Sequence, residues 1–359
     1  MTTKTTLFSL IYLLCTCSGH TQDSSKAREA NELLTALITE SGVTGTAAGY
    51  AVQGKTAAGY RCAENQAPFT DSTRTRTASI AKTMTAVAIM QLVEQGRIDL
   101  DAPVQTYLPD YPKKKAGDIT VRHLLAHTSG TGQYQSDKEA ESQTEFPSLE
   151  AAMAVFKDRE LLFQPGAAFY YTTYGYVVLG RIIEVVSGQN YEAYLQKNIW
   201  DPAGMNDTGV EKIQAEQTNR SCLYQKQKRK TKTATENNLS NRVPGGGLYT
   251  TLDDMIRFGN AIVENRLIKA ETLEQMTQSQ FDQKAGNPYG LGWFLYGPPP
   301  HESVVIGHSG EQTGAATQIM LIPKSKTVVV VLANTSGTWK DVVSLCSALI
   351  GISEKPGQD

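Results

Sequence analysis

Apolar residues recur along this chain with two different periods, and the change from one period to the other marks its organisation. Short runs of β-forming residues around Gly54, between residues 44 and 62, predict an early hairpin. From about residue 98 to residue 240 the apolar positions fall at helical spacing, as in residues 179–186 before Gly188. The middle of the chain is therefore expected to be mainly helical.

The last third of the chain changes to a strand pattern after one more helix. Its apolar runs are bounded by turn-forming residues, as is typical of strands. The predicted elements are a helix over Leu252 to Val263, strands over Ser303 to Ile306, Thr317 to Ile322 and Thr327 to Ala333, a turn over Pro323 to Lys326 that joins the last two, and a helix over Lys340 to Ile350 that ends at Gly351.

Strands at both ends with helices between them predict one α/β lobe built from both ends of the chain. We assign residues 26–97 and 243–355 to this lobe, and residues 98–242 to an inserted, mainly helical lobe. Together they would form one domain over residues 26–355. A site is expected in the cleft between the two lobes.

A hydroxyl nucleophile and an amine lie together at the start of another predicted helix. Ser79 and Lys82 stand at the front of the apolar stretch Thr77 to Gln95, which Gly96 ends. A spacing of three residues puts both side chains on one helix face, within reach of each other. A serine needs such a base to attack a carbonyl group. Because the ordinary pKa of lysine is about 10.4, this use of Lys82 requires burial or another positive group nearby.

The composition is that of a globular protein without a polyanion partner. The 359 residues can form a sizeable core, and 34 Lys and Arg residues against 36 Asp and Glu residues give a net charge of −2. This balance argues against nucleic acid or an anionic membrane as partner. We interpret the basic run Gln225 to Lys232 as a solvated hairpin loop, and the polar segment Asp137 to Ser148 as an exposed connector.

The first residues have the layout of a secretory signal. In Met1 to Gly19, Lys4 precedes an apolar core over Leu7 to Cys15, and small residues follow. This core is too short to span a membrane as a helix. The residues that end at Cys17 also resemble a bacterial lipoprotein box, which would place a lipid anchor there. We expect a secreted or periplasmic protein, with a membrane-anchored lipoprotein as the alternative.

Cysteines and histidines form no recognisable metal or disulfide pattern. Behind the leader only Cys62, Cys222 and Cys346 remain, which implies no disulfide framework and leaves one pair open. His123 and His127 lie four residues apart in an amphipathic turn that ends in glycine. That setting favours a structural role at the helix end over metal binding. No metal is therefore expected.

Signatures of other enzyme classes are also missing from the sequence. There is no G-x-S-x-G nucleophile elbow, no G-x-G-x-x-G and no Walker pattern. The α/β-hydrolase interpretation and nucleotide cofactors are therefore set aside, and no cofactor is expected.

Two further motifs follow Ser79 in the order and spacing of the penicillin-recognising serine hydrolases. They are Tyr171 to Gly180 and Gly307-His308-Ser309-Gly310. On these motifs the chain resembles the class C β-lactamase-related family, most closely its branch of mitochondrial serine β-lactamase-like proteins and their bacterial relatives. The resemblance runs from about Ala47 to Ala333 and includes Ala78 to Lys82, Asp99 to Val104, His123 to Gly130, Phe163 to Gly166 and Gly245 to Asp254. It implies an α/β (α+β) fold of the β-lactamase/transpeptidase type, with an antiparallel sheet flanked by helices and an inserted, mainly helical lobe.

The resemblance also implies a role for each motif residue. Ser79 would be the acylated nucleophile, and Lys82 would accept its proton or hold the neighbouring base. Tyr171 would be that neighbour: its phenolate, favoured by the Lys82 ammonium, would relay protons to the leaving group and from the deacylating water. The substrate-binding and oxyanion positions would be Thr173, His308, Ser309, Gly310 and Glu311, with the oxyanion hole formed by the backbone N–H groups of Ser79 and Glu311.

Two positions depart from the class C pattern. Thr173 stands where these enzymes carry Asn, and His308 where their third motif starts with Lys. A shorter hydroxyl thus replaces an amide, and a mostly neutral imidazole replaces a permanent positive charge. Both changes put efficient β-lactam hydrolysis in doubt. His308 at the start of the third motif resembles the esterase, D-aminopeptidase and mitochondrial β-lactamase-like branches, whose substrates include esters and peptides.

We therefore expect a serine hydrolase that cleaves an amide, peptide or ester bond in a small-molecule or peptide substrate. The oligomeric state is left open. A penicillin-binding D,D-peptidase acting on cell wall is the rival enzyme. A binding or scaffold protein that keeps this fold without turnover is the rival of another class, and the presence of Ser79, Lys82 and Tyr171 together argues against it.

Overall fold

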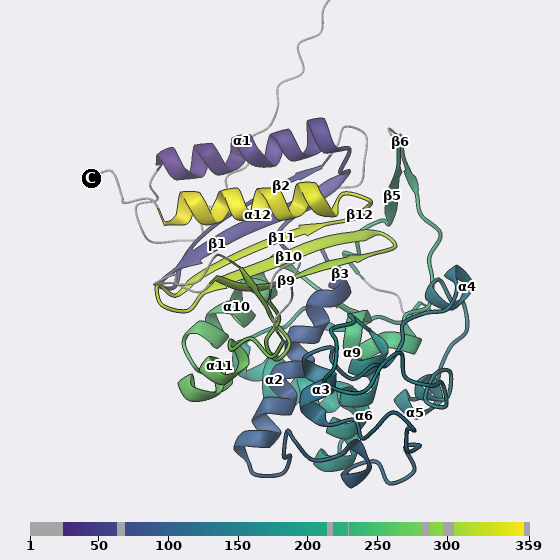
Figure 1. The fold of residues 1–359 in the computed structure, drawn as a ribbon. Helices are drawn as coiled ribbons and strands as arrows, with labels where there is room; N and C mark the ends of the chain where they lie inside the picture. The colour runs from purple at the N-terminus through teal and green to yellow at the C-terminus, as the bar shows by residue number, and fades with distance from the viewer. Residues whose placement is uncertain are drawn as a thin grey trace, which may run out of the picture.

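A six-stranded antiparallel sheet takes its strands from both ends of the chain (Figure 1). The computed structural model describes residues 24–62, 69–213, 218–228, 230–281, 288–296 and 305–354. The strands are, in their order across the sheet, β2 (Lys55–Cys62), β1 (Gly45–Val52), β11 (Thr327–Ala333), β10 (Ala315–Ile322), β9 (Val305–Gln312) and β8 (Phe294–Tyr296). Because β1 pairs with β11, the two ends of the chain meet inside one sheet, as the strand pattern predicts.

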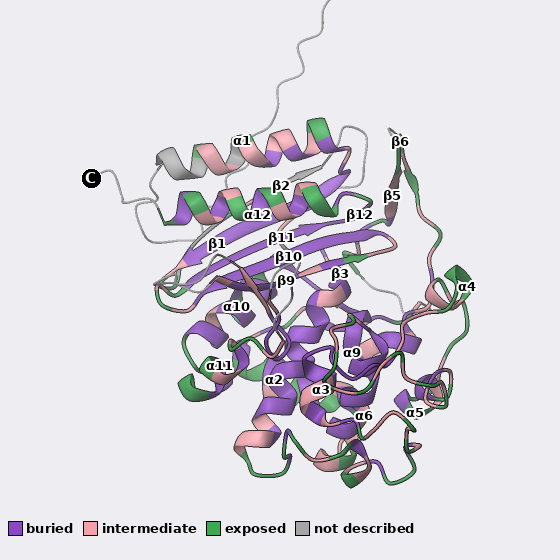
Figure 2. Ribbon diagram, viewed as in Figure 1, coloured by how far each residue is buried: buried purple, intermediate pink, exposed green. Residues whose placement is uncertain are grey.

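Helices cover both faces of this sheet, which explains why β10 and β11 are buried along their whole length (Figure 2). The helices α1 (Ser24–Ser41) and α12 (Trp339–Ser353) form the outer layer, and α10 (Leu252–Val263) packs on the opposite face. Successive side chains of a strand point to opposite faces. Val329 therefore packs under α12, whereas Val328 faces α10. The antiparallel sheet flanked by helices is as predicted.

The other half of the molecule is built around α2 (Ala81–Glu94), which directly follows a 3₁₀ helix over Ala78–Ile80. Nearly all side chains of α2 are buried, as expected of a helix that is apolar all round. It packs against α6 (Tyr174–Ser187) and α9 (Val243–Gly246). The other helices are α3 (Val121–Leu125), α4 (Asp137–Ala140), α5 (Leu149–Met153), α7 (Tyr191–Leu195), α8 (Asp201–Ala203) and α11 (Ala270–Met276), with short helical turns over Val104–Thr106, Gln196–Trp200 and Ser240–Arg242. The division into lobes at residues 97 and 242 stays a prediction.

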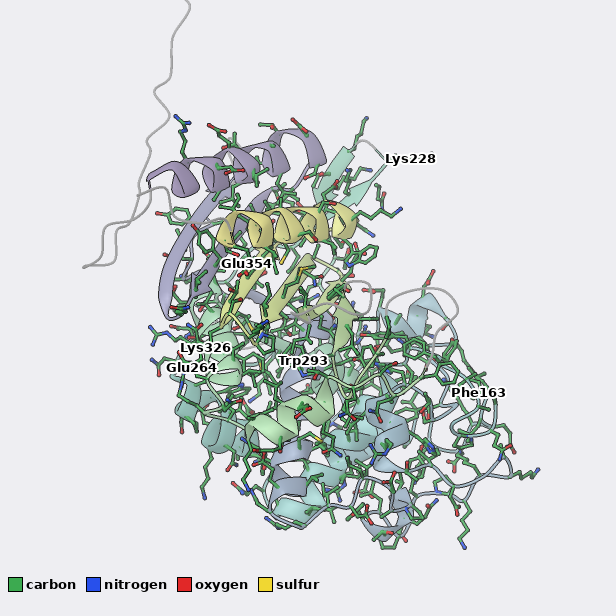
Figure 3. All side chains as sticks on the ribbon, turned by 60° about the vertical axis from the view of Figure 1, so that its left-hand side comes forward. Phe163, Lys228, Glu264, Trp293, Lys326 and Glu354 are labelled. Carbon is green, nitrogen blue, oxygen red and sulfur yellow. The ribbon has the colours of Figure 1, made fainter. Side chains whose placement is uncertain are left out.

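Two small sheets complete the fold. One joins β3 (Thr75–Arg76), β7 (Leu248–Thr250) and β4 (Gly209–Val210), and the other joins β12 (Thr335–Ser336), β5 (Tyr224–Gln227) and β6 (Lys230–Thr233). The hairpin of β5 and β6 carries the basic run, so its prediction as a hairpin at the surface is confirmed. Figure 3 shows Lys228 at the outer edge, whereas Trp293 lies inside the molecule and is fully buried.

Some of the later elements have the predicted bounds, and others are longer than predicted. Strand β9 continues to Gln312 and does not end at Ile306, and β10 begins at Ala315 and not at Thr317. The helix Leu252–Val263 and the strand Thr327–Ala333 have the predicted bounds. The last helix, however, continues through Gly351 to Ser353, because Ile352 is buried in the outer core and holds the final turn. The polar segment predicted as a connector contains the short helix α4. Residues 303 and 304 of the predicted first strand lie outside the described residues.

Neither of the two cysteines whose thiols are described forms a disulfide. Cys222 is exposed and Cys346 is buried, and both are free. The predicted leader, including Cys17, lies outside the described residues. Within the described ranges, no helix is long and apolar enough to cross a membrane.

Candidate active site

The structure places Ser79 in a strained turn at the start of α2. Ser79 lies in the 3₁₀ helix before α2 and is half-buried. The preceding residue, Ala78, has a φ of +48°, in the left-handed region that a side chain rarely adopts. Such strain is found where surrounding structure holds a reactive group in place. Here strand β9 does so, since a Cβ on Gly310 would lie 2.8 Å from the carbonyl oxygen of Thr77 and 2.9 Å from the Cβ of Ala78.

Gly310 therefore has a structural use that sequence analysis did not predict. Its predicted place is among the substrate-binding and oxyanion positions, and the structure shows that it also lets β9 approach the segment of Ser79. The neighbouring Thr317 strengthens this contact by donating a hydrogen bond to the carbonyl of Thr77 at 2.8 Å. Strand β9 and the candidate nucleophile thus form one rigid unit.

Lys82 is fully buried and makes hydrogen bonds only to uncharged oxygens. Its Nζ atom lies 3.1 Å from the Oγ of Ser79, 3.3 Å from the Oγ1 of Thr173 and 2.7 Å from the carbonyl oxygen of Gly245. No ion pair to Lys82 is found in the described parts of the chain. The predicted proximity of serine and amine is confirmed.

The surroundings of Lys82 favour its neutral form. Burial lowers the pKa of Lys82 well below its ordinary value, and the positive charge of Arg242 lowers it further. Burial and a nearby positive charge are the conditions under which a lysine can act as a base near neutral pH. A neutral amine beside a serine hydroxyl can accept the hydroxyl proton as the oxygen attacks.

Tyr171 lies on the other side of the amine, but its ionisation differs from the expectation. The Nζ of Lys82 lies 4.9 Å from the centre of the Tyr171 ring. Burial raises the pKa of Tyr171 above its ordinary value, and a side-chain hydrogen bond with Ser79 opposes this rise only in part. The expected phenolate is therefore wrong for this structure, because burial disfavours the anion and a neutral Lys82 offers it no charge. Tyr171 is a phenol that can donate and accept.

Gln133 is a neighbour of Thr173 that sequence analysis missed. The Gln133 side chain accepts a hydrogen bond from the backbone N–H of Thr173 at 3.0 Å and donates one to its Oγ1 at 3.2 Å. The Gln133 amide thus lies beside the hydroxyl of Thr173, which stands where class C enzymes carry Asn. Nothing in the sequence signals this pair, because forty residues of helix and loop separate the two positions.

His308 is neutral, as expected, but fully buried. Its Nδ1 donates to the carbonyl oxygen of Ser309 at 2.6 Å, and its Nε2 accepts from the hydroxyl of Tyr289 at 3.1 Å. The pKa of His308 is lowered to about 3, mainly by burial, and repulsion from the Lys82 ammonium contributes when Lys82 is protonated. On the same strand Ser309 is half-buried and Glu311 is exposed, whereas the side chain of His308 is fully buried. Its role in substrate binding stays a proposal.

His123 and His127 have separate structural positions and share no metal site. His123 is at the start of α3, where its Nδ1 accepts from the backbone N–H of Thr120, so the expected role at the helix end is wrong for this residue. His127 follows the helix end with a φ of +59° and is fully buried. Its Nδ1 accepts from the N–H of Thr172, which fixes the segment of Tyr171. Among the described residues, no group of three or more His, Cys, Asp or Glu could hold a metal ion.

A buried ion pair connects Arg76, in the strand β3 before Ser79, to Glu211, which directly follows β4. The Arg76 and Glu211 side chains are 1% and 2% exposed, and their shortest N···O distance is 2.6 Å. Arg76 also donates to the side chain of Asn237 at 2.6 Å and to the carbonyl oxygen of Thr313 at 2.8 Å. No pattern in the sequence signals this network. It links the segment before Ser79 to the turn after Glu311, the two residues of the candidate oxyanion hole.

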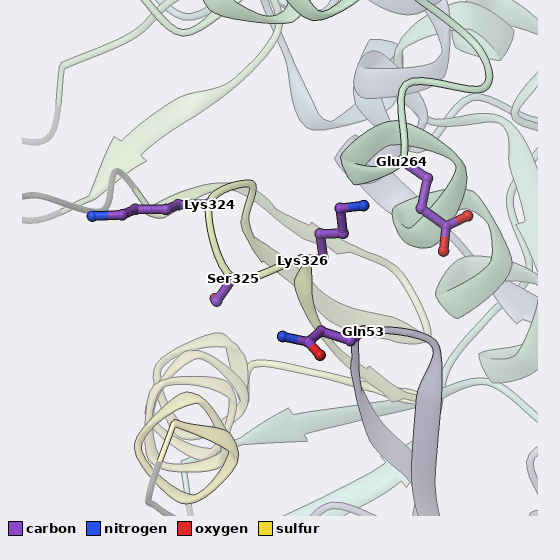
Figure 4. Close-up of a pocket in the computed structure, with 5 residues that line it drawn as sticks. All are labelled: Gln53, Glu264, Lys324, Ser325 and Lys326. Carbon is purple, nitrogen blue, oxygen red and sulfur yellow. The ribbon is translucent and has the colours of Figure 1, made fainter.

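A separate polar hollow lies near the turns at one edge of the sheet (Figure 4). Its lining residues are Gln53, Glu264, Lys324, Ser325 and Lys326. It contains none of the predicted site residues.

The family model described as Beta-lactamase matches residues 30–345. The mitochondrial serine beta-lactamase-like protein LACTB of Homo sapiens is 28% identical over 395 residues, which cover 82% of this chain and 72% of the human protein. All predicted site residues, from Ser79 to Glu311, lie within the range of the family match.

Solved structures resemble the whole fold. The octameric penicillin-binding protein homologue from Pyrococcus abyssi is 27% identical with a TM-score of 0.80, and covers 90% of this chain and 77% of its own. The D-stereospecific amidohydrolase from Streptomyces sp. is 25% identical with a TM-score of 0.74, and covers 89% of this chain and 97% of its own.

Proposed function

This chain belongs to the Beta-lactamase family, and from that membership we propose that it cleaves an amide, peptide or ester bond through an acyl-enzyme on Ser79. The predicted family, fold and class of serine hydrolase are confirmed by the family match and the similar structures. The residues that carry the reaction, its substrate and its location belong to the proposal.

One observation carries this proposal: a buried lysine amine, with only neutral hydrogen-bond partners, lies 3.1 Å from a half-exposed serine hydroxyl. In the acylation step the Oγ of Ser79 attacks the carbonyl carbon of the substrate, and its proton passes to Lys82. The oxyanion that forms would accept hydrogen bonds from the backbone N–H groups of Ser79 and Glu311. Collapse of this intermediate breaks the bond to the amine or alcohol.

Tyr171 would complete the proton transfers. Because burial keeps it a phenol, it can donate its proton to the leaving group while it takes one from Lys82. A water molecule would then attack the acyl carbon and give a proton to Tyr171, while Tyr171 passes its own proton to Lys82. Lys82 would finally protonate the Oγ of Ser79 as the bond between this oxygen and the acyl carbon breaks. No cofactor is required in this sequence of steps.

The site favours substrates that present no carboxylate to the third motif, Gly307-His308-Ser309-Gly310. His308 is neutral and covered, so it gives a substrate carboxylate no positive charge. Thr173 and Gln133 instead offer a hydroxyl and an amide, which suit a neutral peptide or ester group. The similar Streptomyces protein is a D-stereospecific amidohydrolase, which supports a substrate with an amide bond. The D,D-peptidase function remains the alternative.

We further propose that the protein is secreted or periplasmic, with a lipid anchor at Cys17 as the alternative. This rests on the signal-like layout of Met1 to Gly19. The human relative is mitochondrial and the Pyrococcus relative is octameric. Mass spectrometry of the protein expressed in a bacterium would identify its first residue, and size-exclusion chromatography its assembly.

Acylation of Ser79 is tested by intact-mass spectrometry after exposure to a fluorophosphonate and, separately, to a penicillin. We expect a single fluorophosphonate adduct that is lost in Ser79→Ala and strongly reduced in Lys82→Ala. Ser347→Ala, on the exposed side of α12, is the matched control and should label as the wild type does. A lasting penicilloyl adduct would favour the D,D-peptidase. A folded wild type that takes no label would refute the hydrolase and leave the scaffold.

A further inference from the structure

Arg242 is a buried cation beside the candidate site, and no described residue serves as its counter-ion. The residue is 5% exposed, and its guanidinium lies 4.5 Å from the centre of the Tyr134 ring. Its Nε donates to the side-chain oxygen of Asn241 at 2.9 Å, whereas its Nη2 is buried and has no hydrogen-bond partner. No ion pair to it is found in the ranges that the structure describes. A buried charge without a partner costs free energy, and its field disfavours further positive charge on the groups around it.

The segment that begins with Arg242 also binds the amine of Lys82. Arg242 directly precedes α9, and three residues later the carbonyl oxygen of Gly245 accepts the hydrogen bond of the Lys82 Nζ at 2.7 Å. We propose that Arg242 keeps Lys82 in its neutral, proton-accepting form through repulsion between two cations in a buried site. This inference rests on the proposed use of Lys82 as a base. Arg242 acts through Lys82 and is therefore a positioning residue.

None of the described groups that face Lys82 supplies a positive charge, so Arg242 is the cation that can repel its proton. They are all uncharged near neutral pH: Ser79, His127, Tyr171, Thr173, Tyr176 and His308. In the related class C pattern a lysine stands at the third motif, but here His308 is neutral and cannot supply a second positive charge. Burial is the larger cause of the lowered pKa of Lys82, and Arg242 adds to it.

The carboxylates near Arg242 do not cancel its charge by direct pairing. Glu139 and Glu141 both lie close enough to act on the neighbouring Tyr134. Glu139, however, pairs with Arg159 at 2.9 Å. Glu141 accepts hydrogen bonds from Asn237 at 2.8 Å and from Thr313 at 2.6 Å. In the described ranges neither carboxylate thus pairs directly with the guanidinium, and Arg242 remains one of the causes that lower the pKa of Lys82.

The test is a direct measurement of the Lys82 pKa, by NMR titration of protein labelled with ¹³C at the lysine ε-carbon. The Lys82 signal is identified by its loss in Lys82→Ala. In Arg242→Met we expect the Lys82 pKa to rise, on the order of one unit, because a like charge that disfavours the ammonium is removed. Arg242→Lys keeps the charge and should restore a value near that of the wild type.

A second variant covers the case in which Arg242→Met does not fold. Asn241→Asp keeps the guanidinium and places a carboxylate on its Nε, which should also raise the Lys82 pKa. Arg181→Met removes a cation that pairs with Glu184 on α6 and should leave the Lys82 signal unchanged. A Lys82 pKa that stays at the wild-type value in folded Arg242→Met or Asn241→Asp would overturn the inference.

The same variants separate this inference from the proposed hydrolase. If Lys82 is the base, the pH at which fluorophosphonate labelling reaches half its maximum rate should rise with the Lys82 pKa. At a pH below that midpoint, a rise of one unit lowers the labelling rate about tenfold. If the pKa moves but wild type is not labelled, the inference about Arg242 holds and the proposed reaction fails.

Discussion

The Nζ atom of Lys82 lies 2.7 Å from the carbonyl oxygen of Gly245, although 163 positions separate the two residues along the chain. This contact holds the amine where it also meets Ser79, 3.1 Å away. The carbonyl oxygen can only accept, so it fixes one amine hydrogen and leaves the nitrogen oriented toward the hydroxyls. The position of the base therefore depends on a glycine-rich turn as much as on its own helix.

Gly245→Ala should lower the rate of fluorophosphonate labelling at least tenfold. A Cβ at Gly245 would lie 2.5 Å from the Cγ2 and 3.1 Å from the carbonyl oxygen of Thr173, so Thr173, which accepts a hydrogen bond from Lys82, must move. Displacements of this size in a catalytic group cost large factors in rate. Gly351→Ala, where no atom lies within 4 Å of the added methyl group, is the control. Unchanged labelling in Gly245→Ala would contradict the assigned geometry.

Thr173→Val should reduce labelling about tenfold while the protein stays folded. The change removes the hydroxyl that accepts from Lys82 and Gln133 and keeps the shape of the side chain. A hydrogen bond of this kind contributes about 1 kcal/mol, and about 1.4 kcal/mol corresponds to a tenfold change in rate. Thr173→Ser keeps the hydroxyl and should retain most of the rate. Equal losses in the two variants would show that shape and not the hydroxyl matters.

Glu211→Ala should destabilise the protein by about 3–5 kcal/mol, because it leaves the buried guanidinium of Arg76 without its partner. Urea unfolding followed by circular dichroism measures this difference. Glu192→Ala removes an exposed partner of Lys212 and should change the free energy of unfolding by no more than about 1 kcal/mol. Similar effects of the two substitutions would rule out the special role of the buried pair.

The protein should lose stability as the pH falls below about 6.5, and His308 should contribute to this loss. Its pKa is lowered to about 3 in the folded state, whereas an unfolded histidine titrates near 6.5. Between these values the unfolded state binds a proton that the folded state does not. The free energy of unfolding then falls by up to about 1.4 kcal/mol for each pH unit and each such histidine.

His308→Gln removes this contribution and should flatten the dependence of stability on pH between about 6.5 and 3. Urea unfolding at several pH values gives the slope. His123, which is half-buried in α3, provides the comparison, since its pKa is lowered less strongly. A slope in His308→Gln equal to that of the wild type would mean that the imidazole titrates normally in the fold.

Local patterns predicted those features that neighbouring residues decide. The helix Leu252–Val263 and the strand Thr327–Ala333 have their predicted bounds, because apolar periodicity and flanking turn residues act over a few positions. The end of the last helix was misplaced at Gly351, since the burial of Ile352 in the outer core overrides the weak preference of one glycine. Tyr171 was misjudged in its ionisation for the same kind of reason, because burial depends on segments far away in the sequence.

By itself, the sequence determined that Ser79 and Lys82 share one face at the start of a helix, because that relation requires only a spacing of three residues. It also determined the family, through motifs whose order and spacing can be read along the chain. Only the tertiary structure decided what surrounds the amine. Gly245 and Arg242 come from distant turns, and burial with electrostatic repulsion sets the charge of a lysine through space.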